Sequence, residues 1–289
     1  IAFIVGWNLV LEYTVTASAV ASGWSGYVTG LLLSAGIDPG HALTSVPADG
    51  GIINLPAICI TLLLSFFLIR GTQESSKINR ILVFVKLAAV FIFLLLAGPQ
   101  VNTANWEPFM PFGMQGIAAG AAIVFFAYIG FDAVATTAEE CKNPARDLPI
   151  GIIGSLIICT LLYVVVAGVL TGIVPYTELN SPEPVAYALR YIGYNLGSAL
   201  VGVGAIAGIT TVLLVLLYGQ ARIFFAMSRD GMVPANVCKI HKRYHTPYIV
   251  TVLGAVFVSC IAGFAPIGVI AEMANIGTLS AFTVAAIGV

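Results

Sequence analysis

The residues best suited to bind a ligand lie in segment 125–140, an apolar run with Gly130 and Asp132 in its middle. A carboxylate in hydrocarbon is costly unless it faces a partner or a wet cavity. Glycine weakens a helix and leaves backbone groups available to a ligand. Because broken helices of this kind form binding sites near the bilayer midplane, the segment predicts such a site. A continuous helix with a packing glycine and an interfacial aspartate is the alternative.

Lys86 is a second ionisable residue within an apolar run, less than two turns beyond Arg80. A lysine at this depth can snorkel, returning its ammonium to the headgroups. If it faces the interior of a helix bundle instead, desolvation favours the neutral amine and allows the group to gain and lose a proton during a cycle. Both interpretations remain open from the sequence.

Glu12, Thr210 and Thr211 are candidates for a polar pocket. Glu12 lies deep in the first apolar segment and needs either a proton or a partner, and a protonated carboxyl bonded to a neighbouring helix would meet that need. Thr210 and Thr211 offer hydroxyls to a coupling site. They follow Gly204 and Gly208, a GxxxG pair that favours close helix packing without chemistry.

The composition places these residues in a membrane protein. Of 289 residues, 59% are hydrophobic and only 9% are charged, whereas soluble domains average about 25% charged residues. The net charge of −1 excludes a bulk attraction to nucleic acid. The five cysteines have no metal-ligand spacing, and the three histidines lie in loops. We therefore expect no cofactor, no metal site and no enzymatic activity, since no nucleophile and base lie together in one span.

A membrane span requires roughly 20 predominantly apolar residues, and eight segments qualify, so an all-α polytopic protein is expected. The predicted spans cover residues 1–33, 52–69, 81–97, 117–137, 150–174, 199–227, 249–264 and 267–289. Ten of the twelve lysines and arginines fall in loops 70–80, 138–149 and 228–247 or beside them. By the positive-inside rule these loops are cytoplasmic. Segment 183–194, in an external loop, predicts a short interfacial helix.

Several strings are similar to the amino acid–polyamine–organocation (APC) superfamily of permeases. Segment 139–152 resembles the loop after that family's sixth helix, and segment 222–234 with Thr246 and Pro247 resembles the loop after its eighth. The string GFDAVATT at 130–137 resembles the cationic amino acid transporter branch and its bacterial relatives. The strings GWNL at 6–9 and NIGTL at 275–279 extend the resemblance over nearly the whole chain.

The resemblance implies a fold of two five-helix inverted repeats, of which the eight spans represent helices three to ten. Residues 1–97 would then complete the first repeat, 98–116 form an external loop, and 117–289 form the second repeat, with helix six broken near 126–130. Helices one, two and eleven onward would lie outside the chain, which is expected to be a fragment. In the family, helix one supplies about half of the site.

The resemblance also implies roles for individual residues. The carbonyls of Phe126, Ala127 and Ile129, next to Gly130, would accept the substrate ammonium, and Phe126 would gate the site. Asp132 matches an acidic position near the side-chain pocket. Lys86 matches the lysine that replaces sodium in proton-coupled members.

The function implied is secondary active transport of an amino acid in a cell membrane, coupled to protons by alternating access. The substrate is either cationic or small and neutral. An uncoupled exchanger is the alternative within transport, and a non-transporting amino acid sensor or subunit is the alternative outside it. The expected partners are the amino acid, the proton and the lipid bilayer, with no nucleic acid.

Overall fold

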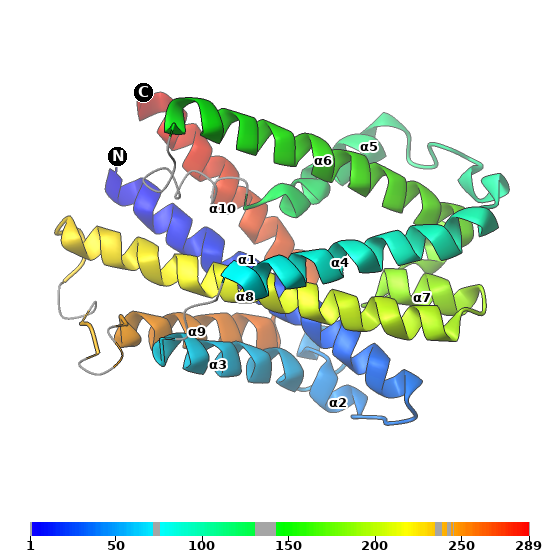
Figure 1. Cartoon of the computed structure of the whole chain (residues 1–289), viewed down its shortest axis with the longest axis horizontal. Coiled ribbons are helices and arrows are strands. Elements are labelled where there is room, and N and C mark those ends of the chain that lie inside the picture. The colour runs from blue at the N-terminus through cyan, green and yellow to red at the C-terminus, as the bar shows by residue number, and fades with distance from the viewer. Residues whose placement is uncertain are drawn as a thin grey trace.

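The computed structural model describes residues 2–71, 76–130, 143–234, 239–241, 244 and 246–288, and all regular structure in them is helical (Figure 1). The main helices are α1 (Ala2–Ser34), α3 (Leu55–Ile69), α4 (Ser76–Ala97), α5 (Gly113–Val124), α6 (Pro144–Ile173), α8 (Asn195–Arg229), α9 (Tyr248–Phe264) and α10 (Ile267–Gly288). Two shorter helices are α2 (His41–Thr44) and α7 (Pro184–Tyr191), and a 3-10 turn, η4 (Phe125–Tyr128), follows α5.

Each of the eight predicted spans forms a helix, but three of these helices are shorter than a full crossing. By length and composition, five helical segments can cross a membrane: Phe3–Ser34, Ile81–Gln100, Pro144–Ile173, Asn195–Arg229 and Ile267–Val284. Leu55–Ile69, Gly113–Tyr128 and Tyr248–Phe264 are apolar but shorter. Helix α3, which corresponds to the second predicted span, starts later than predicted. The Asn54 side chain accepts a hydrogen bond from the Ala57 N–H and caps the helix there. Helix α5, which corresponds to the fourth predicted span, is short because α-helical bonding stops at Val124.

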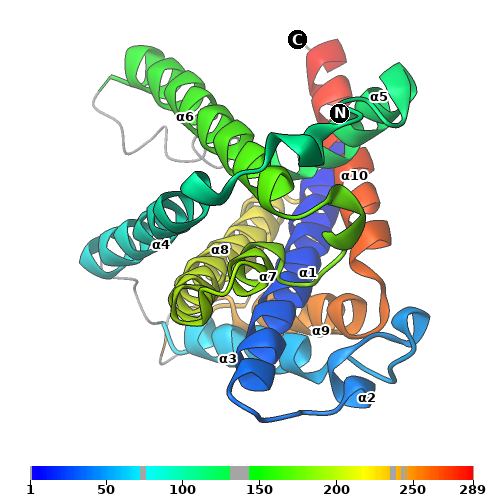
Figure 2. The same cartoon turned by 90° about the vertical axis from the view of Figure 1, so that its right-hand side faces the viewer.

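Helix α1 is the central element, as Figures 1 and 2 show, and it packs most extensively against α8 and α10. Small residues permit this close approach, because Ala17 and Ala21 of α1 are fully buried against Leu213 and Leu217 of α8. Helices α3 and α9 pack together on the same side of the bundle.

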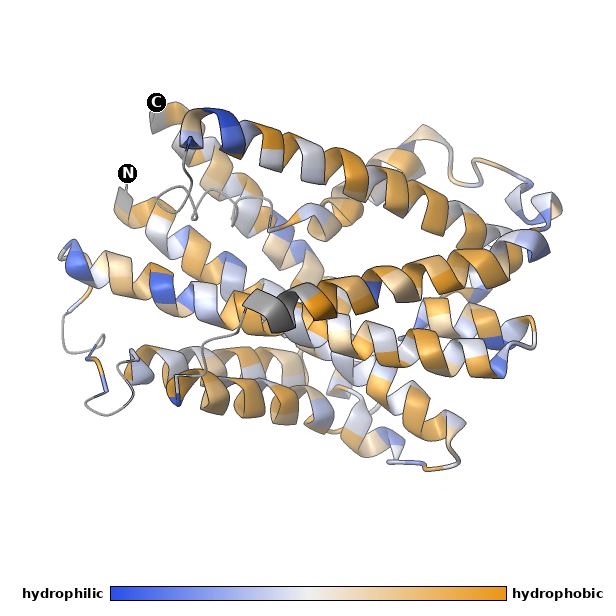
Figure 3. Ribbon diagram, in the orientation of Figure 1, coloured by the Kyte–Doolittle hydropathy of each residue, from blue (hydrophilic) through white to orange (hydrophobic). Residues whose placement is uncertain are grey.

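Helices α4 and α6 extend away from this central group in Figure 2 and are coloured largely apolar in Figure 3. Large side chains such as Phe84, Leu95, Ile158 and Val164 are exposed on them. In a membrane protein such surfaces face lipid or other helices, since lipid tails impose no cost on apolar side chains.

The GxxxG pair of α8 makes the close helix contact that its sequence indicates. A Cβ on Gly204 would lie 2.5 Å from the Cβ of Ala89 in α4, and a Cβ on Gly208 would lie 3.0 Å from the Cβ of Lys86. The prediction of close packing is therefore confirmed. The contact also fixes the stem of Lys86 against α8.

The short helix predicted at 183–194 is present as α7, and an ion pair that joins its N-cap residue to its last turn lies against α1. Arg190 pairs with Glu183, whose exposed fraction is only 6%. Arg190 also donates to Ser198 Oγ over 3.1 Å, which links α7 to α8. Gly30 of α1 makes room for the pair, because a Cβ there would lie 1.9 Å from the Glu183 carboxyl carbon.

We expect Gly30→Ala to lower the free energy of unfolding by about 1–3 kcal/mol, because the added methyl displaces a buried, paired carboxylate. Thermal unfolding in detergent measures this effect. Gly202→Ala in α8 is the matched control, since a Cβ at Gly202 meets nothing within 4 Å in the described part of the chain and alanine is the better helix former. Equal melting temperatures for the two variants would contradict the role assigned to Gly30.

Candidate functional site

The predicted break in the fourth apolar segment begins where α5 ends, at Val124. The chain continues as the 3-10 turn η4, becomes extended at Ile129 with ψ of 133°, and reaches Gly130 at φ of 113°. Only glycine adopts such a positive φ without strain. The interruption thus starts slightly before the predicted 126–130. Asp132 lies outside the described residues.

The Ala127 carbonyl, predicted to accept a substrate ammonium, accepts a hydrogen bond from Tyr163 of α6. The distance from Tyr163 Oη to this oxygen is 2.9 Å, and Tyr128 Oη donates to Thr160 Oγ1 over 3.1 Å. The two tyrosine rings also make an edge-to-face contact. Tyr163 therefore supports η4, a role that the sequence analysis did not anticipate. A tyrosine within an apolar span was the available signal.

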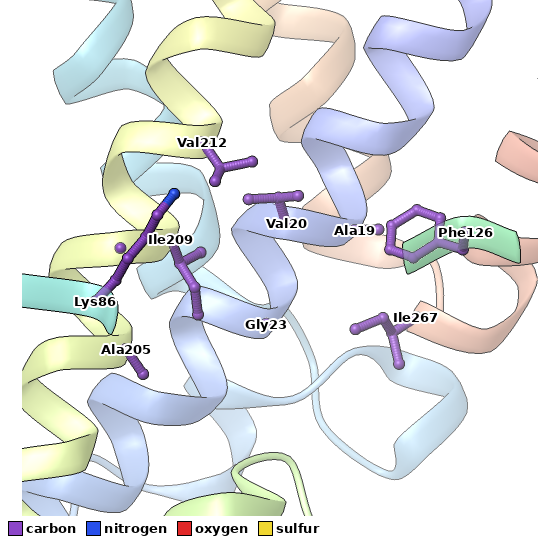
Figure 4. Close-up of a pocket in the computed structure, with 10 residues that line it drawn as sticks. Ala19, Val20, Gly23, Lys86, Phe126, Ala205, Ile209, Val212 and Ile267 are labelled. Atoms are coloured by element: carbon purple, nitrogen blue, oxygen red, sulfur yellow. The ribbon is translucent and has the colours of Figure 1, made fainter. Parts of the chain in front are cut away.

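A pocket of about 420 Å³ lies between α1, α4, α8, η4 and α10 (Figure 4). This volume falls within the range of small-molecule sites. The pocket is lined by Ala19, Val20, Gly23, Lys86, Phe126, Ala205, Gly208, Ile209, Val212 and Ile267. Apart from Lys86, all of these residues are apolar or glycine.

The pocket brings together two residues that the sequence analysis singled out, Lys86 and Phe126. In Figure 4 Lys86 enters from α4 on one side and Phe126 from η4 on the other, with Val20 and Ala19 of α1 between them. The Lys86 side chain runs past Ile209, with its nitrogen on the side of Val212 and Val20. Ala127, Ile129 and Gly130 continue from Phe126 but are not among the lining residues.

The three residues predicted for a polar pocket are not among the residues that line this pocket. Glu12 is buried, and its Cα lies 3.9 Å from where a Cβ on Gly277 of α10 would be. The Thr210 hydroxyl accepts from Trp24 Nε1 over 2.9 Å and donates to the Ile206 carbonyl. Thr211 donates to the Gly208 carbonyl over 2.7 Å. Thr210 therefore ties α1 to α8 directly beside the pocket.

Together, the fold and the pocket define a class: a multi-pass helical membrane protein with a ligand-sized pocket beside an interrupted helix. The chain belongs to the amino acid permease family, whose model matches residues 1–289. The APC resemblance deduced from the loop strings is thereby confirmed. The family consists of transport proteins, which agrees with the expectation that the chain is not an enzyme.

Two bacterial relatives are similar to the whole chain. The methylthioribose transporter of Bacillus subtilis (strain 168) is 46% identical over 291 residues, and the branched-chain amino acid permease BcaP of the same organism is 45% identical over 293 residues. Both alignments cover 100% of this chain and 63% of the relative. The vacuolar cationic amino acid transporter 4 of Arabidopsis thaliana is 37% identical over 298 residues, covering 99% of the chain and 49% of that protein. The chain thus spans less than two thirds of the length of these relatives.

Proposed function

We propose that the complete protein containing this chain is a secondary transporter of neutral amino acids with branched apolar side chains. The observation that carries this proposal is the lining of the pocket, in which alanine, valine, isoleucine and phenylalanine side chains surround a single charged group, Lys86. Burying an apolar side chain there contributes roughly 25 cal/mol per Å² of apolar surface removed from water. The similarity to a branched-chain amino acid permease supports the same substrate class.

A cationic substrate fits this lining less well. The charged residue among the described lining residues is itself a cation, and an ammonium or guanidinium group beside a charged Lys86 would be repelled. The relative named as a cationic transporter is also less similar to the chain than the branched-chain permease, at 37% against 45% identity.

Methylthioribose is the second candidate, because a relative that is 46% identical is named for its transport. Its thioether methyl group suits an apolar pocket. Its sugar hydroxyls, however, need hydrogen-bond partners when they leave water. Among the described lining side chains only Lys86 offers a polar group, which favours the branched-chain amino acid.

The amino acid head group is proposed to bind at the interrupted helix. The carbonyls of Phe126, Ala127 and Ile129 accept the ammonium, Gly130 permits the turn, and the Phe126 ring closes over the side chain. The Ala127 carbonyl already accepts from Tyr163 and the Phe126 carbonyl already accepts from the Ile129 N–H, so we assign the larger share of this contact to the Ile129 carbonyl. The proposal keeps Asp132 near the side-chain pocket.

Lys86 is proposed to couple transport to protons by alternating access. Its stem is fixed on Gly208 while its nitrogen lies along the pocket, so the presence of substrate and the charge of the amine influence each other. The proposal places residues 1–97 and 117–289 in two inverted repeats. It places Glu12, Thr210 and Thr211 where helices of these two repeats pack together. Loops 70–80, 138–149 and 228–247 face the cytoplasm of a cell whose plasma membrane contains the protein.

Uptake into proteoliposomes tests this function with radiolabelled leucine, isoleucine, valine, arginine and methylthioribose. With the complete protein and an inward proton gradient of one pH unit, we expect leucine to accumulate about tenfold, the limit for one proton per substrate. A protonophore should abolish accumulation, and arginine should not compete. Leucine exchange without accumulation would indicate an uncoupled exchanger. Leucine binding without uptake would indicate a sensor, and preferential uptake of methylthioribose would replace the proposed substrate.

A further inference from the structure

The end of α5 leaves backbone carbonyls in need of hydrogen-bond donors. The last four carbonyls of an α-helix have no partner within the helix, and in α5 these belong to residues 121–124. The Phe125 N–H satisfies the Ala121 carbonyl. Beyond this point the bonds of η4 run three residues back, so the α-helical pattern does not continue to the carbonyl of Ala122.

Asn275 of α10 supplies a donor to this position from across the helix interface. Its Nδ2 lies 2.8 Å from the Ala122 carbonyl oxygen and 3.4 Å from the Ile123 carbonyl oxygen. The residue is 7% exposed, and its Oδ1 has no hydrogen-bond partner among the described residues. Since two carbonyls can only accept, the amide must present its nitrogen to them. The side chain is therefore oriented by the helix end that it bonds.

The same stretch of α10 packs against the residues of the break. Ile270 and Ala274, one helical turn apart, form an apolar cluster with Val15 and Ala19 of α1, against which Phe126 and Ile129 pack. Ala19 and Phe126 also line the pocket. A hydrogen bond at Asn275 thus anchors α5 to the helix that also contacts the predicted gate.

We propose that Asn275 is a positioning residue that holds the interruption of helix α5–η4 open and thereby places Phe126 and the following carbonyls at the pocket. Without the Asn275 amide donor, the Ala122 carbonyl loses a hydrogen bond. Re-forming α-helical bonds through Phe126 then becomes favourable, because it supplies this carbonyl with a new donor. That change would rotate Phe126 away from its place in the lining. The functional part of this inference rests on the proposed transport function, whereas the structural part does not.

Thr278, one turn further along α10, provides a matched control. Thr278 is buried like Asn275, but its hydroxyl donates to the Ala274 carbonyl of its own helix, over 3.0 Å. Thr278→Val therefore removes a buried hydrogen bond from the same helix but leaves the bonds between Asn275 and α5 in place. A loss caused only by weakening α10 would affect both variants alike.

The test compares Asn275→Asp and Thr278→Val in the complete protein with the wild type. Asn275→Asp keeps the shape of the side chain but turns an acceptor oxygen toward the two carbonyls. We expect hydrogen–deuterium exchange of the amides in 122–130, measured without ligand, to become about tenfold faster in this variant only, as the loss of one buried hydrogen bond predicts. The dissociation constant for leucine should rise about tenfold in Asn275→Asp and stay near the wild-type value in Thr278→Val.

Unchanged exchange in 122–130, or equal effects of Asn275→Asp and Thr278→Val, would overturn the proposal. If Asn275→Asp does not fold, Asn275→Ser shortens the side chain without adding charge and gives the same test. If the wild type binds no leucine, the proposed function fails. The exchange measurement still decides whether Asn275 holds the interruption, so the two failures are distinguishable.

Discussion

Lys86→Met should abolish gradient-driven accumulation of leucine in proteoliposomes, a reduction of at least about tenfold, while leaving the protein folded. Lys86 is the one charged residue among the described lining of the pocket, and its stem contacts Gly208 of α8. Methionine retains most of the stem packing but cannot carry a proton. The measurement is the ratio of internal to external leucine with an inward proton gradient, together with leucine exchange at equal pH.

Arg222→Met is the matched control for this substitution. Arg222 is an exposed cation of α8 that lies over the Tyr218 ring, away from the pocket lining. The Arg222→Met variant should accumulate leucine like the wild type. Exchange that persists in Lys86→Met without accumulation would assign proton coupling to Lys86. Full accumulation in Lys86→Met would return this lysine to a snorkelling role.

Gly23→Leu should reduce leucine uptake at subsaturating concentration by about tenfold or more, because the new side chain occupies the space of the substrate. Gly23 lines the pocket, and a Cβ there meets no atom of the described residues within 4 Å. The added side chain therefore starts from an open position in the pocket lining. Gly23→Ala should have a smaller effect that is greater for leucine than for alanine as substrate. Initial uptake rates over a range of concentrations measure both.

Gly168→Leu controls for the effect of adding a leucine to a helix. Gly168 lies in α6, outside the pocket lining, and no other residue that the structure describes lies within 4 Å of a Cβ placed there. This variant should transport leucine at close to the wild-type rate. If Gly23→Leu transported leucine as fast as Gly168→Leu, the substrate would not occupy the pocket beside α1.

The sequence predicted the helices of this protein well, because membrane helices are marked by long apolar runs. Each of the eight predicted segments contains a helix, the short helix predicted at 183–194 is present as α7, and Gly204 and Gly208 make a close helix contact. The lengths of the helices were less predictable. Apolar residues lie on both sides of Asn54 and of Val124, so the apolar pattern does not mark a helix end there. Helix α3 begins at the Asn54 cap, and helix α5 ends at Val124 where the hydrogen bonding changes.

The candidate site was predictable only in part. Lys86 and Phe126 were identified separately, and both line one pocket. Glu12, Thr210 and Thr211 were assigned to a polar pocket because hydroxyl and carboxyl groups are rare in apolar spans. In the structure the Thr210 hydroxyl accepts from Trp24 of α1, and the Thr211 hydroxyl donates to the backbone of its own helix. Whether a polar group binds a ligand or a neighbouring helix depends on which way it faces.

By itself, then, the sequence determined that the chain is helical, membrane-embedded and a member of the amino acid permease family, and it located the rare polar residues. Only the tertiary structure decided that Lys86 and Phe126 share a pocket, that the Ala127 carbonyl faces Tyr163, and that Asn275 bonds the end of α5. The physical reason is that a membrane helix is apolar on nearly all sides. Its sequence therefore carries little information about which face meets which neighbour, and packing between helices makes that choice.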